Sequence, residues 1–539
     1  MKQARRLVWF TLSTVLLCAL LGGLYGRQVE ATTGADDSDV KQSFSTFTRV
    51  YDVVAQNYAD PVDPDKAIYG PTNGNVGAIP SALRTLDPHS NFFDPRAFSL
   101  LREDQEGKYF GVGMSIVARP GKMGKLVTVV VAPIPGSPAF RAGLRPGDIV
   151  AKVNGKPTEG LNTPQVADML KGPKGTTVHV TIVREGYEQP LEFDITRDEI
   201  SQHSVDDAFT IRPGIAYIKI SKFNENTNDE LTDALKKLNE KTLHGLILDL
   251  RSNPGGLLQE AVEVSDHFLE KSQLIVYHYG RHSPEKRYFA TKGDNGNEYP
   301  IVVLINRMTA SAAEIVTGAL QDHDRALVMG EPSFGKGLVQ TVYPLSEHTG
   351  LALTTARYYT PSGRLIQRDY KNVSLYDYYY RPETTTNTNN GEVRLTDGGR
   401  EVYGGGGITP DIRVPETKLT PVQETLLQHG TFFNFGKYYL GIHKTIPPDF
   451  QVNDEVMNEF RQFLNKEKIN ISDQDLQSNL DYIKTRIRVQ LVGSIFGEDE
   501  ADKISIDHDP LVQKALTELP QAKELLANAK RYIASKDQK

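Results

Sequence analysis

The sequence predicts a multidomain protein of the α/β class. Its 539 residues exceed what a single hydrophobic core usually organises, so several folded domains are expected. Between residues 199 and 420, short apolar runs that read as strands alternate with helical segments, which is the pattern of an α/β layer. A helical and then a β-rich stretch precede this region, and a charged, largely helical stretch follows it. We therefore expect an α/β core with further domains before and after it in the chain.

The chain begins with a segment typical of an export signal. An apolar run from Leu7 to about Tyr25 nearly spans a ~30 Å hydrocarbon layer at a ~1.5 Å rise per residue. Basic residues precede this run, namely Lys2, Arg5 and Arg6. By the positive-inside rule, the arrangement predicts a signal anchor over residues 1–26, a linker over 27–42, and a body in the periplasm or another extracytoplasmic space. Because the segment lacks a clear small-residue cleavage site, we favour an uncleaved anchor in the cytoplasmic (inner) membrane over a cleaved signal peptide.

Composition argues against several classes of protein. The formal net charge of −7 comes without a basic stripe, so nucleic acid is not expected as a partner. The only cysteine, Cys18, lies in the N-terminal segment, which leaves the body without disulfides, thiolate metal sites or a cysteine nucleophile. His278 and His282 have a spacing that suits a metal on a helix, but Gly280 favours a strand end or loop there. We predict no metal and no cofactor.

Residues 43–103 are predicted to form a helical region. Apolar side chains recur in it at helical spacing, at Phe44, Phe47, Val50, Tyr51, Val54 and Tyr58. The helices end at the Leu-Asp-Pro-His-Ser turn of residues 86–90, where Pro88 disfavours helix in its predecessor.

Residues 104–198 consist of short β-rich runs with glycine turns, which predicts a separate compact domain. Its first segment can present backbone N–H groups to a terminal carboxylate, and the strand that follows can pair with an extended peptide. The residues concerned are Gly111, Val112, Gly113, Met114 and Ile116. The alternative is a simple glycine-containing lead-in to a hairpin.

Ser311 is the first candidate for chemistry. It follows an apolar strand over residues 301–305 and opens a helix, where unpaired backbone N–H groups stabilise developing negative charge. That is a suitable place for an acyl-enzyme nucleophile. Taken alone, the turn would favour a serine that merely caps the helix.

Lys336 lies in a Gly-x4-Gly-Lys sequence, which invites a phosphate-loop interpretation. The next residue is Gly337 rather than Ser or Thr, and a β-like run follows instead of a helix, so we reject that interpretation. As a general base, Lys336 would need a pKa lowered from ~10.4 toward ~7, and burial among apolar residues can supply this shift. Gln340 can orient the amine without adding charge. A solvated loop lysine is the alternative.

The segment from Asp249 to Gly256 reads as a strand followed by a glycine turn. Glycines let backbone N–H groups approach a substrate closely, so Gly255 or Gly256 can form an oxyanion hole together with the Ala312 amide. An ordinary strand-to-helix turn would have the same composition.

Two further segments complete the chain. Residues 370–400 are rich in Tyr, Thr, Asn and Gly without periodicity, and we interpret them as an inserted surface loop in a core that spans 199–420. Residues 421–539 are predicted to form a helical C-terminal region.

At this point the motifs resemble a known family. The Gly-Leu-Arg-Pro-Gly-Asp-Ile-Val stretch of residues 143–150 looks like a PDZ domain. Ser311 with Lys336 and Gln340, flanked by the motifs at residues 86–90 and 359–363, is similar to the C-terminal processing (tail-specific) proteases.

The resemblance implies a crotonase-like ββα protease core with an inserted PDZ domain, a helical N-terminal region and a helical C-terminal extension. It implies that Ser311 is the nucleophile, Lys336 its base and Gln340 the orienter of the base. The oxyanion donors would be the Ala312 amide and that of Gly255 or its neighbour. Arg184 is the candidate for an arginine that couples peptide binding to activation in some members.

The expected function is that of a serine endopeptidase that recognises C-terminal tails of exported proteins through its PDZ domain. Expected partners are protein substrates with exposed C-termini, with a homodimer and an adaptor or activator protein as further candidates. A non-catalytic PDZ scaffold is the alternative from another class. A Ser-His-Asp hydrolase using His323 with Asp322 or Asp324 is disfavoured, because residues adjacent in sequence on a polar helix end rarely share a site.

Overall fold

A computed structural model describes residues 37–70, 77–121, 124–294, 296–371, 373–380 and 392–537. The predicted anchor over residues 1–26 lies outside these ranges. None of the helices in the described part of the chain has both the length and the apolar composition needed to cross a membrane. The chain divides into two compact units, residues 1–79 and 80–539, which are described separately.

The described part of the first unit is helical, as the apolar spacing predicted. It comprises α2 (Asp37–Asn57) and α3 (Pro64–Tyr69), while α4 (Ala78–Arg84) crosses the unit boundary. The side chain of Asp63 caps α3 by accepting backbone N–H bonds at its first turn. Along α2, the apolar side chains from Val40 to Val54 are largely exposed.

The β-rich domain of the second unit is an antiparallel sheet with two helices. The sheet has the order β3 (Met114–Pro120), β4 (Leu126–Pro133), β5 (Ile149–Val153), β7 (Thr177–Val183) and β8 (Leu191–Thr196), with β6 (Lys156–Pro157) beside β5. The helices are α6 (Pro138–Arg141) and α7 (Thr163–Leu170). The chain enters and leaves along the antiparallel pair β2 (Lys108–Gly111) and β9 (Asp198–Ser201), so the domain is an insertion between α5 (Pro95–Glu106) and the core.

The core is built on a six-stranded, mostly parallel sheet. Its order is β10 (Val205–Arg212), β11 (Ile215–Ile220), β12 (Gly245–Asp249), β15 (Ile301–Ile305), β16 (Ala326–Gly330) and β21 (Ile412–Arg413), with β10 antiparallel to its neighbour. Both faces are covered, so the central strands β12, β15 and β16 are buried at every position and mostly apolar.

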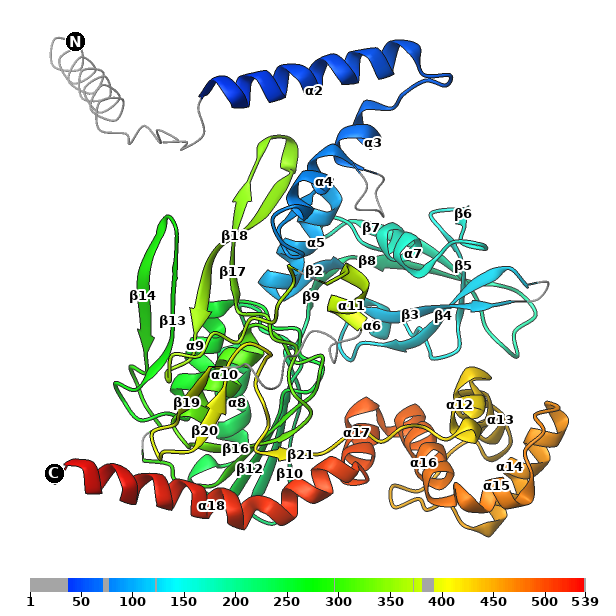
Figure 1. The fold of residues 1–539 in the computed structure, drawn as a ribbon. Helices are drawn as coiled ribbons and strands as arrows, with labels where there is room; N and C mark the ends of the chain where they lie inside the picture. The colour runs from blue at the N-terminus through cyan, green and yellow to red at the C-terminus, as the bar shows by residue number, and fades with distance from the viewer. Residues whose placement is uncertain are drawn as a thin grey trace, which may run out of the picture. The chain divides into compact units, whose positions relative to one another are not determined.

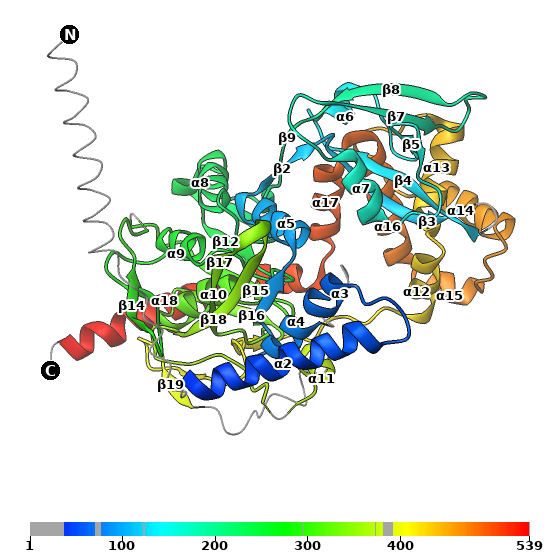
Figure 2. The same ribbon diagram turned by 90° about the horizontal axis from the view of Figure 1, so that it is seen from above.

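The two faces of this sheet are packed by different helices. On one face, Leu246 and Leu248 pack with α8 (Thr227–Lys237), α9 (Leu258–Asp266) and α10 (Ala312–Asp322), of which α9 and α10 lie side by side (Figure 2). On the other face, Ile247 packs with the long helix α18 (Pro510–Asp537), drawn in red along the base of the sheet in Figure 1. The alternation along β12 therefore divides the core into two layers.

A second sheet of five antiparallel strands carries part of the site. The strand β18 (Gly350–Tyr359) lies at its centre and pairs with β1 (Asn91–Phe93), β13 (Leu274–Gly280) and β17 (Leu338–Pro344), and β14 (Ser283–Phe289) pairs with β13. The β17–β18 pairing shifts register between Val339 and Gln340.

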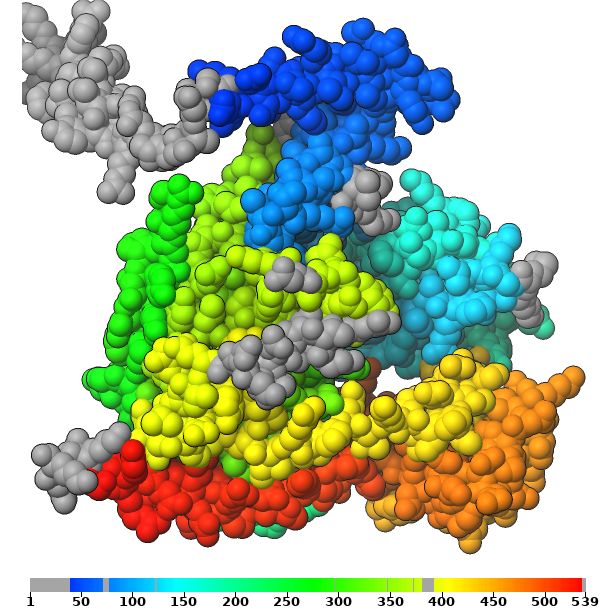
Figure 3. Space-filling model, viewed as in Figure 1, coloured from blue at the N-terminus to red at the C-terminus, as the bar shows by residue number. Residues whose placement is uncertain are grey.

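The segment over residues 370–400 differs from the surface loop that we expected. It contains the helix α11 (Leu375–Tyr380) and the strand β19 (Val393–Leu395), which pairs with β20 (Glu401–Tyr403). Each element is too short for periodicity to reveal it, and α11 is held by contacts with distant residues rather than by its own propensity. In Figure 3 the surface of the β19–β20 region (yellow) adjoins that of α18 (red).

The C-terminal region is helical, as predicted. After the core, the chain forms α12 (Pro421–Gln428), α13 (Thr431–His443), α14 (Asp454–Lys466), α15 (Asp473–Ser478), α16 (Leu480–Phe496) and α17 (Glu498–Asp507) before α18. Aromatic residues such as Phe435 and Phe460 form a separate hydrophobic core between these helices.

Candidate active site

The predicted catalytic and oxyanion residues line a single cavity of about 420 Å³ in the second unit. They come from four segments of the chain: the turn after β12 (Gly255 and Gly256), the start of α10 (Ser311 and Ala312), the loop after β16 (Lys336), and β17 (Gln340). The rest of the wall is mostly apolar and includes Phe93, Leu258 and Ile315.

Ser311 sits at the junction between β15 and α10 with a backbone that serine rarely adopts. Its φ is +55° and its ψ is −116°, in a region where non-glycine residues are strained by roughly 1–3 kcal/mol. Gly255 packs directly against it, since a Cβ at position 255 would lie 2.7 Å from the Ser311 Cβ. The surrounding structure thus fixes a strained nucleophile turn.

A buried carboxylate, Glu314, ties the two candidate catalytic segments together. It accepts hydrogen bonds from the N–H groups of Ser311 (2.8 Å), Gly335 (2.7 Å) and Lys336 (2.9 Å), and from the Ser333 hydroxyl (2.5 Å). Burial raises the pKa of Glu314, while these hydrogen bonds act in the opposite direction. The sequence analysis did not assign it a role, although the Ser-x-x-Glu spacing at the start of a helix is a recognisable signal.

Tyr358 holds the same two residues at their carbonyl groups. Its hydroxyl lies 2.5 Å from the Lys336 carbonyl oxygen and 3.1 Å from that of Ser311, and shares one proton between them. Two buried side chains therefore bind both residues at their backbones. Glu314 accepts the N–H groups of Ser311 and Lys336, and Tyr358 donates to their carbonyl oxygens.

The Lys336 amine is oriented by Gln340. Its Nζ lies 2.9 Å from the Gln340 Oε1, and the Gln340 Nε2 donates to the carbonyl oxygen of His89. Burial lowers the pKa of Lys336, against the opposing influence of the Glu314 and Asp87 carboxylates. Among the described residues, no hydrogen bond joins the Ser311 hydroxyl to the Lys336 amine, although both line the cavity.

The backbone geometry distinguishes between the two glycines that were considered as oxyanion donors. The Gly255 N–H donates to the Asn253 Oδ1 at 2.8 Å and so is occupied. The N–H groups of Gly256 and Ala312 have no hydrogen-bond partner within the described ranges. Position 256 also requires glycine, because its φ is +145° and a Cβ there would lie 2.0 Å from the Phe223 carbonyl oxygen.

The residues predicted to read a peptide terminus lie at one edge of the β-rich domain. Gly111 ends β2, Val112 and Gly113 connect it to β3, and Met114 and Ile116 belong to β3. As an edge strand that packs beside α7, β3 offers one side for strand addition.

Arg184 occupies a structural position in the same domain. Its guanidinium pairs with the buried Asp148 at 2.7 Å and donates to the Gly143 carbonyl at 2.9 Å. It is not among the residues that line the catalytic cavity. The ion pair gives Arg184 a structural role in this domain, and its coupling role stays a prediction.

The alternative triad with His323 is excluded by geometry. The His323 Nδ1 lies 2.6 Å from Asp397 and its Nε2 lies 2.7 Å from the Leu274 carbonyl oxygen, so both ring nitrogens face away from Ser311. Neither Asp322 nor Asp324 lines the cavity around Ser311.

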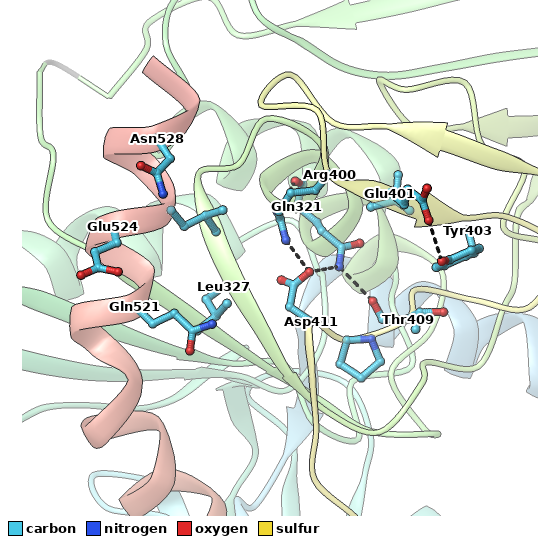
Figure 4. Close-up of a pocket in the computed structure, with 13 residues that line it drawn as sticks. Gln321, Leu327, Arg400, Glu401, Tyr403, Thr409, Asp411, Gln521, Glu524 and Asn528 are labelled. Carbon is cyan, nitrogen blue, oxygen red and sulfur yellow. Dashed lines mark hydrogen bonds and ion pairs between the residues drawn. The ribbon is translucent and has the colours of Figure 1, made fainter. Parts of the chain in front are cut away.

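A second cavity, of about 530 Å³, lies between α18 and the segment after β19 (Figure 4). On the side opposite α18, polar groups pair with one another: Arg400 binds Asp411 at 2.5 Å, and the Gln321 amide donates to Asp411 and to the Thr409 carbonyl. It contains none of the predicted catalytic residues.

Comparison with known proteins agrees with this architecture. The model of peptidase family S41 matches residues 214–373, a PDZ domain model matches 129–184, and the model described as "Probable PDZ-protease, C-terminal helical domain" matches 422–474. The fold and the cavity thus define a serine-type peptidase that carries a PDZ domain.

The relatives narrow this class to one family. The carboxy-terminal-processing protease of Bartonella bacilliformis is 36% identical over 367 residues, which cover 67% of this chain and 80% of that protein. The carboxy-terminal processing protease CtpB of Bacillus subtilis is 33% identical over 343 residues, covering 63% of this chain and 68% of the relative. A solved photosystem II D1 C-terminal processing protease is 27% identical, covers 68% of this chain and 92% of its own, and has a TM-score of 0.33. The chain belongs to the carboxy-terminal processing protease family.

Proposed function

We propose that the protein hydrolyses peptide bonds with Ser311 as nucleophile and Lys336 as general base. The observation that carries this proposal is the cavity that Ser311 and the partly buried Lys336 both line, with the backbone N–H and C=O groups of both residues bound by Glu314 and Tyr358. A neutral amine is needed to accept a proton, and burial favours that form of Lys336 by lowering its pKa.

The reaction follows from these positions. Lys336 takes the proton from the Ser311 hydroxyl while the Ser311 Oγ attacks the substrate carbonyl, and the resulting oxyanion is stabilised by the free N–H groups of Gly256 and Ala312. Lys336 then gives the proton to the leaving amine, which breaks the peptide bond and leaves an acyl-enzyme. Water, deprotonated by Lys336, releases the acyl group and restores Ser311.

The substrate tail is proposed to bind at β3. An extended C-terminus adds as a strand to this edge, with its carboxylate facing the backbone of residues 111–114. The apolar wall of the catalytic cavity favours an apolar residue beside the cleaved bond.

The test is cleavage of an unstructured polypeptide with an apolar free C-terminus. Ser311→Ala and Lys336→Ala are expected to lower kcat/KM by about a thousandfold or more, because each removes one half of a unit that acts together. The matched controls are the exposed Ser478→Ala and Lys514→Ala, which should cleave like the wild type.

Two other outcomes would count against the dyad. If either catalytic variant retains activity while folded, the assignment of that residue fails. If the wild type binds the tail without cutting it, a PDZ scaffold is the better account of this chain.

We further infer that the protein is anchored in the cytoplasmic membrane with its body in the extracytoplasmic space. The support is the apolar run with its basic N-terminal flank, over residues 1–26. In a bacterial host, the full chain should fractionate with membranes and be degraded by protease added to spheroplasts. Recovery of the intact chain from the cytoplasm would contradict this inference.

A homodimer and an adaptor protein remain predictions, testable by sedimentation and by affinity capture.

A further inference from the structure

The helix α11 reaches the catalytic residues through a buried tyrosine. Tyr378 is 1% exposed, and its hydroxyl lies 2.8 Å from the His89 Nε2 and 3.1 Å from the Gln367 Nε2. Tyr379, the next residue, donates a hydrogen bond from its hydroxyl to the Pro88 carbonyl oxygen at 2.9 Å. Two successive tyrosines of α11 therefore bind the turn of residues 87–90.

The direction of each hydrogen bond in this network is fixed by its neighbours. The Gln367 Oε1 accepts the Gly337 N–H at 2.9 Å, so the Gln367 amide nitrogen must be the group that faces Tyr378. The Tyr378 hydroxyl accepts that bond, and among the described residues the His89 Nε2 is the one acceptor within reach of its own proton, so it donates to His89. His89 is therefore neutral with Nε2 unprotonated, which agrees with a pKa lowered to about 3 by burial and by the nearby Lys336.

The same turn determines which way Gln340 faces. The His89 carbonyl oxygen can only accept, so the Gln340 Nε2 points to it and the Gln340 Oε1 is left to face the Lys336 Nζ. Asp87 supports the turn from inside by accepting the N–H groups of His89 and Ser90, each at 2.7 Å. A shift of the His89 peptide would consequently move Gln340 away from Lys336.

We propose that α11 is a latch on the active site, in which Tyr378 is a positioning residue that holds the turn of residues 87–90 so that Gln340 faces Lys336. The inference rests on the proposed Ser311–Lys336 dyad and adds to it the residues that keep Gln340 oriented toward the Lys336 amine. The Tyr378 ring also packs edge-on against Phe334, two residues before Lys336, so removal of the hydroxyl alone leaves the aromatic packing in place.

The direct test is Tyr378→Phe in the full chain, measured with an unstructured peptide that carries a fluorophore–quencher pair and a free apolar C-terminus. Tyr378→Phe removes the hydrogen bonds to His89 and Gln367, and the bond to His89 is the one that holds the turn. The expected result is a fall in kcat of about tenfold, with KM unchanged. Tyr380→Phe is the matched control, because Tyr380 lies on the same helix and is 72% exposed. It should cleave like the wild type.

A double-mutant cycle separates positioning from general stability. In a Gln340→Ala background, Tyr378→Phe should change kcat by less than about twofold, because the residue through which Tyr378 acts is gone. Gln367 would still be held by its bonds to Gly337 and the Arg368 carbonyl, so the Lys336 backbone should not move. A tenfold loss in both backgrounds, or a loss that follows a lowered Tm, would overturn the latch.

The outcomes also separate the latch from the dyad beneath it. If Ser311→Ala is inactive and Tyr378→Phe cleaves like the wild type, the latch fails and the dyad stands. If Ser311→Ala cleaves, the proposed function itself fails.

Discussion

Ser311 and Lys336 are positioned mainly by what binds their backbones. The Ser311 backbone is in a strained region, and strain of this kind persists only where several contacts determine it. Here those contacts are the Glu314 carboxylate at the N–H groups and the Tyr358 hydroxyl at the carbonyls of both residues. Relative movement of nucleophile and base would therefore have to break bonds to a shared partner.

Glu314→Gln tests whether the shared hydrogen bonds of Glu314 position Ser311 and Lys336. All four groups bound to Glu314 are donors, and a glutamine would turn an NH₂ group toward two of them. We expect the unfolding free energy to fall by about 2–4 kcal/mol, from two buried donors left unpaired, and kcat to fall at least tenfold. Thermal denaturation and peptide cleavage measure the two effects. Gln259→Glu, at an exposed position on α9, serves as a charge-changing control. Wild-type kcat in a folded Glu314→Gln protein would show that the hydrogen bonds of Glu314 are not needed to position the dyad.

At the scale of elements, an irregularity in the pairing of β17 with β18 lies beside the site. The partners of Val339 and Gln340 are Ala356 and Thr354, so Thr355 of β18 is the extra residue, and a β-bulge of this kind bends and twists the paired strands locally. Gln340 lines the cavity, while β17 continues its pairing as far as Pro344. The bulge thus allows one strand both to pair in its sheet and to present an orienting group to Lys336.

The helix α18 is the element that closes the other face of the core sheet. Leu519 is 6% exposed and packs against Gly245 at the start of β12, where an added Cβ would lie 3.0 Å from it. Leu519→Ala should lower the unfolding free energy by about 2–4 kcal/mol, the usual cost of truncating a buried leucine. Leu395→Ala, at a position 58% exposed, is the matched control for denaturation. Equal stability of the two variants would mean that α18 is not an integral layer of the core.

For the whole molecule, the sequence predicted what lies within contiguous motifs and missed what the fold brings together. Ser311, Lys336 and Gln340 could be found because each lies in a patterned segment near a strand end. Tyr358 and Tyr378 could not, because their partners are distant in the sequence and no local spacing relates them; His89 lay in a motif at residues 86–90, but its bond to Tyr378 was equally hidden. The choice between Gly255 and Gly256 depended on the Asn253 side chain, which occupies one of the two N–H groups.

The order of the domains was predictable because it depends on patterns within contiguous segments. Apolar periodicity identified the helical and α/β regions, since long elements carry many positions that report the same period. The short elements α11 and β19 escaped because they contain 6 and 3 residues, fewer than the pattern needs. The helix that carries the latch is therefore the part of the site that required the three-dimensional structure.

The measurement that tests the central claim most directly is acylation of the enzyme by a peptide ester, followed by mass spectrometry across a range of pH. The account predicts an acyl group on Ser311, at a rate that rises with pH and reaches its plateau below the ~10.4 of an ordinary lysine, because burial lowers the Lys336 pKa. It also predicts that Lys336→Met abolishes this acylation. An acyl group on another residue, or an unchanged rate in Lys336→Met, would contradict the Ser–Lys dyad.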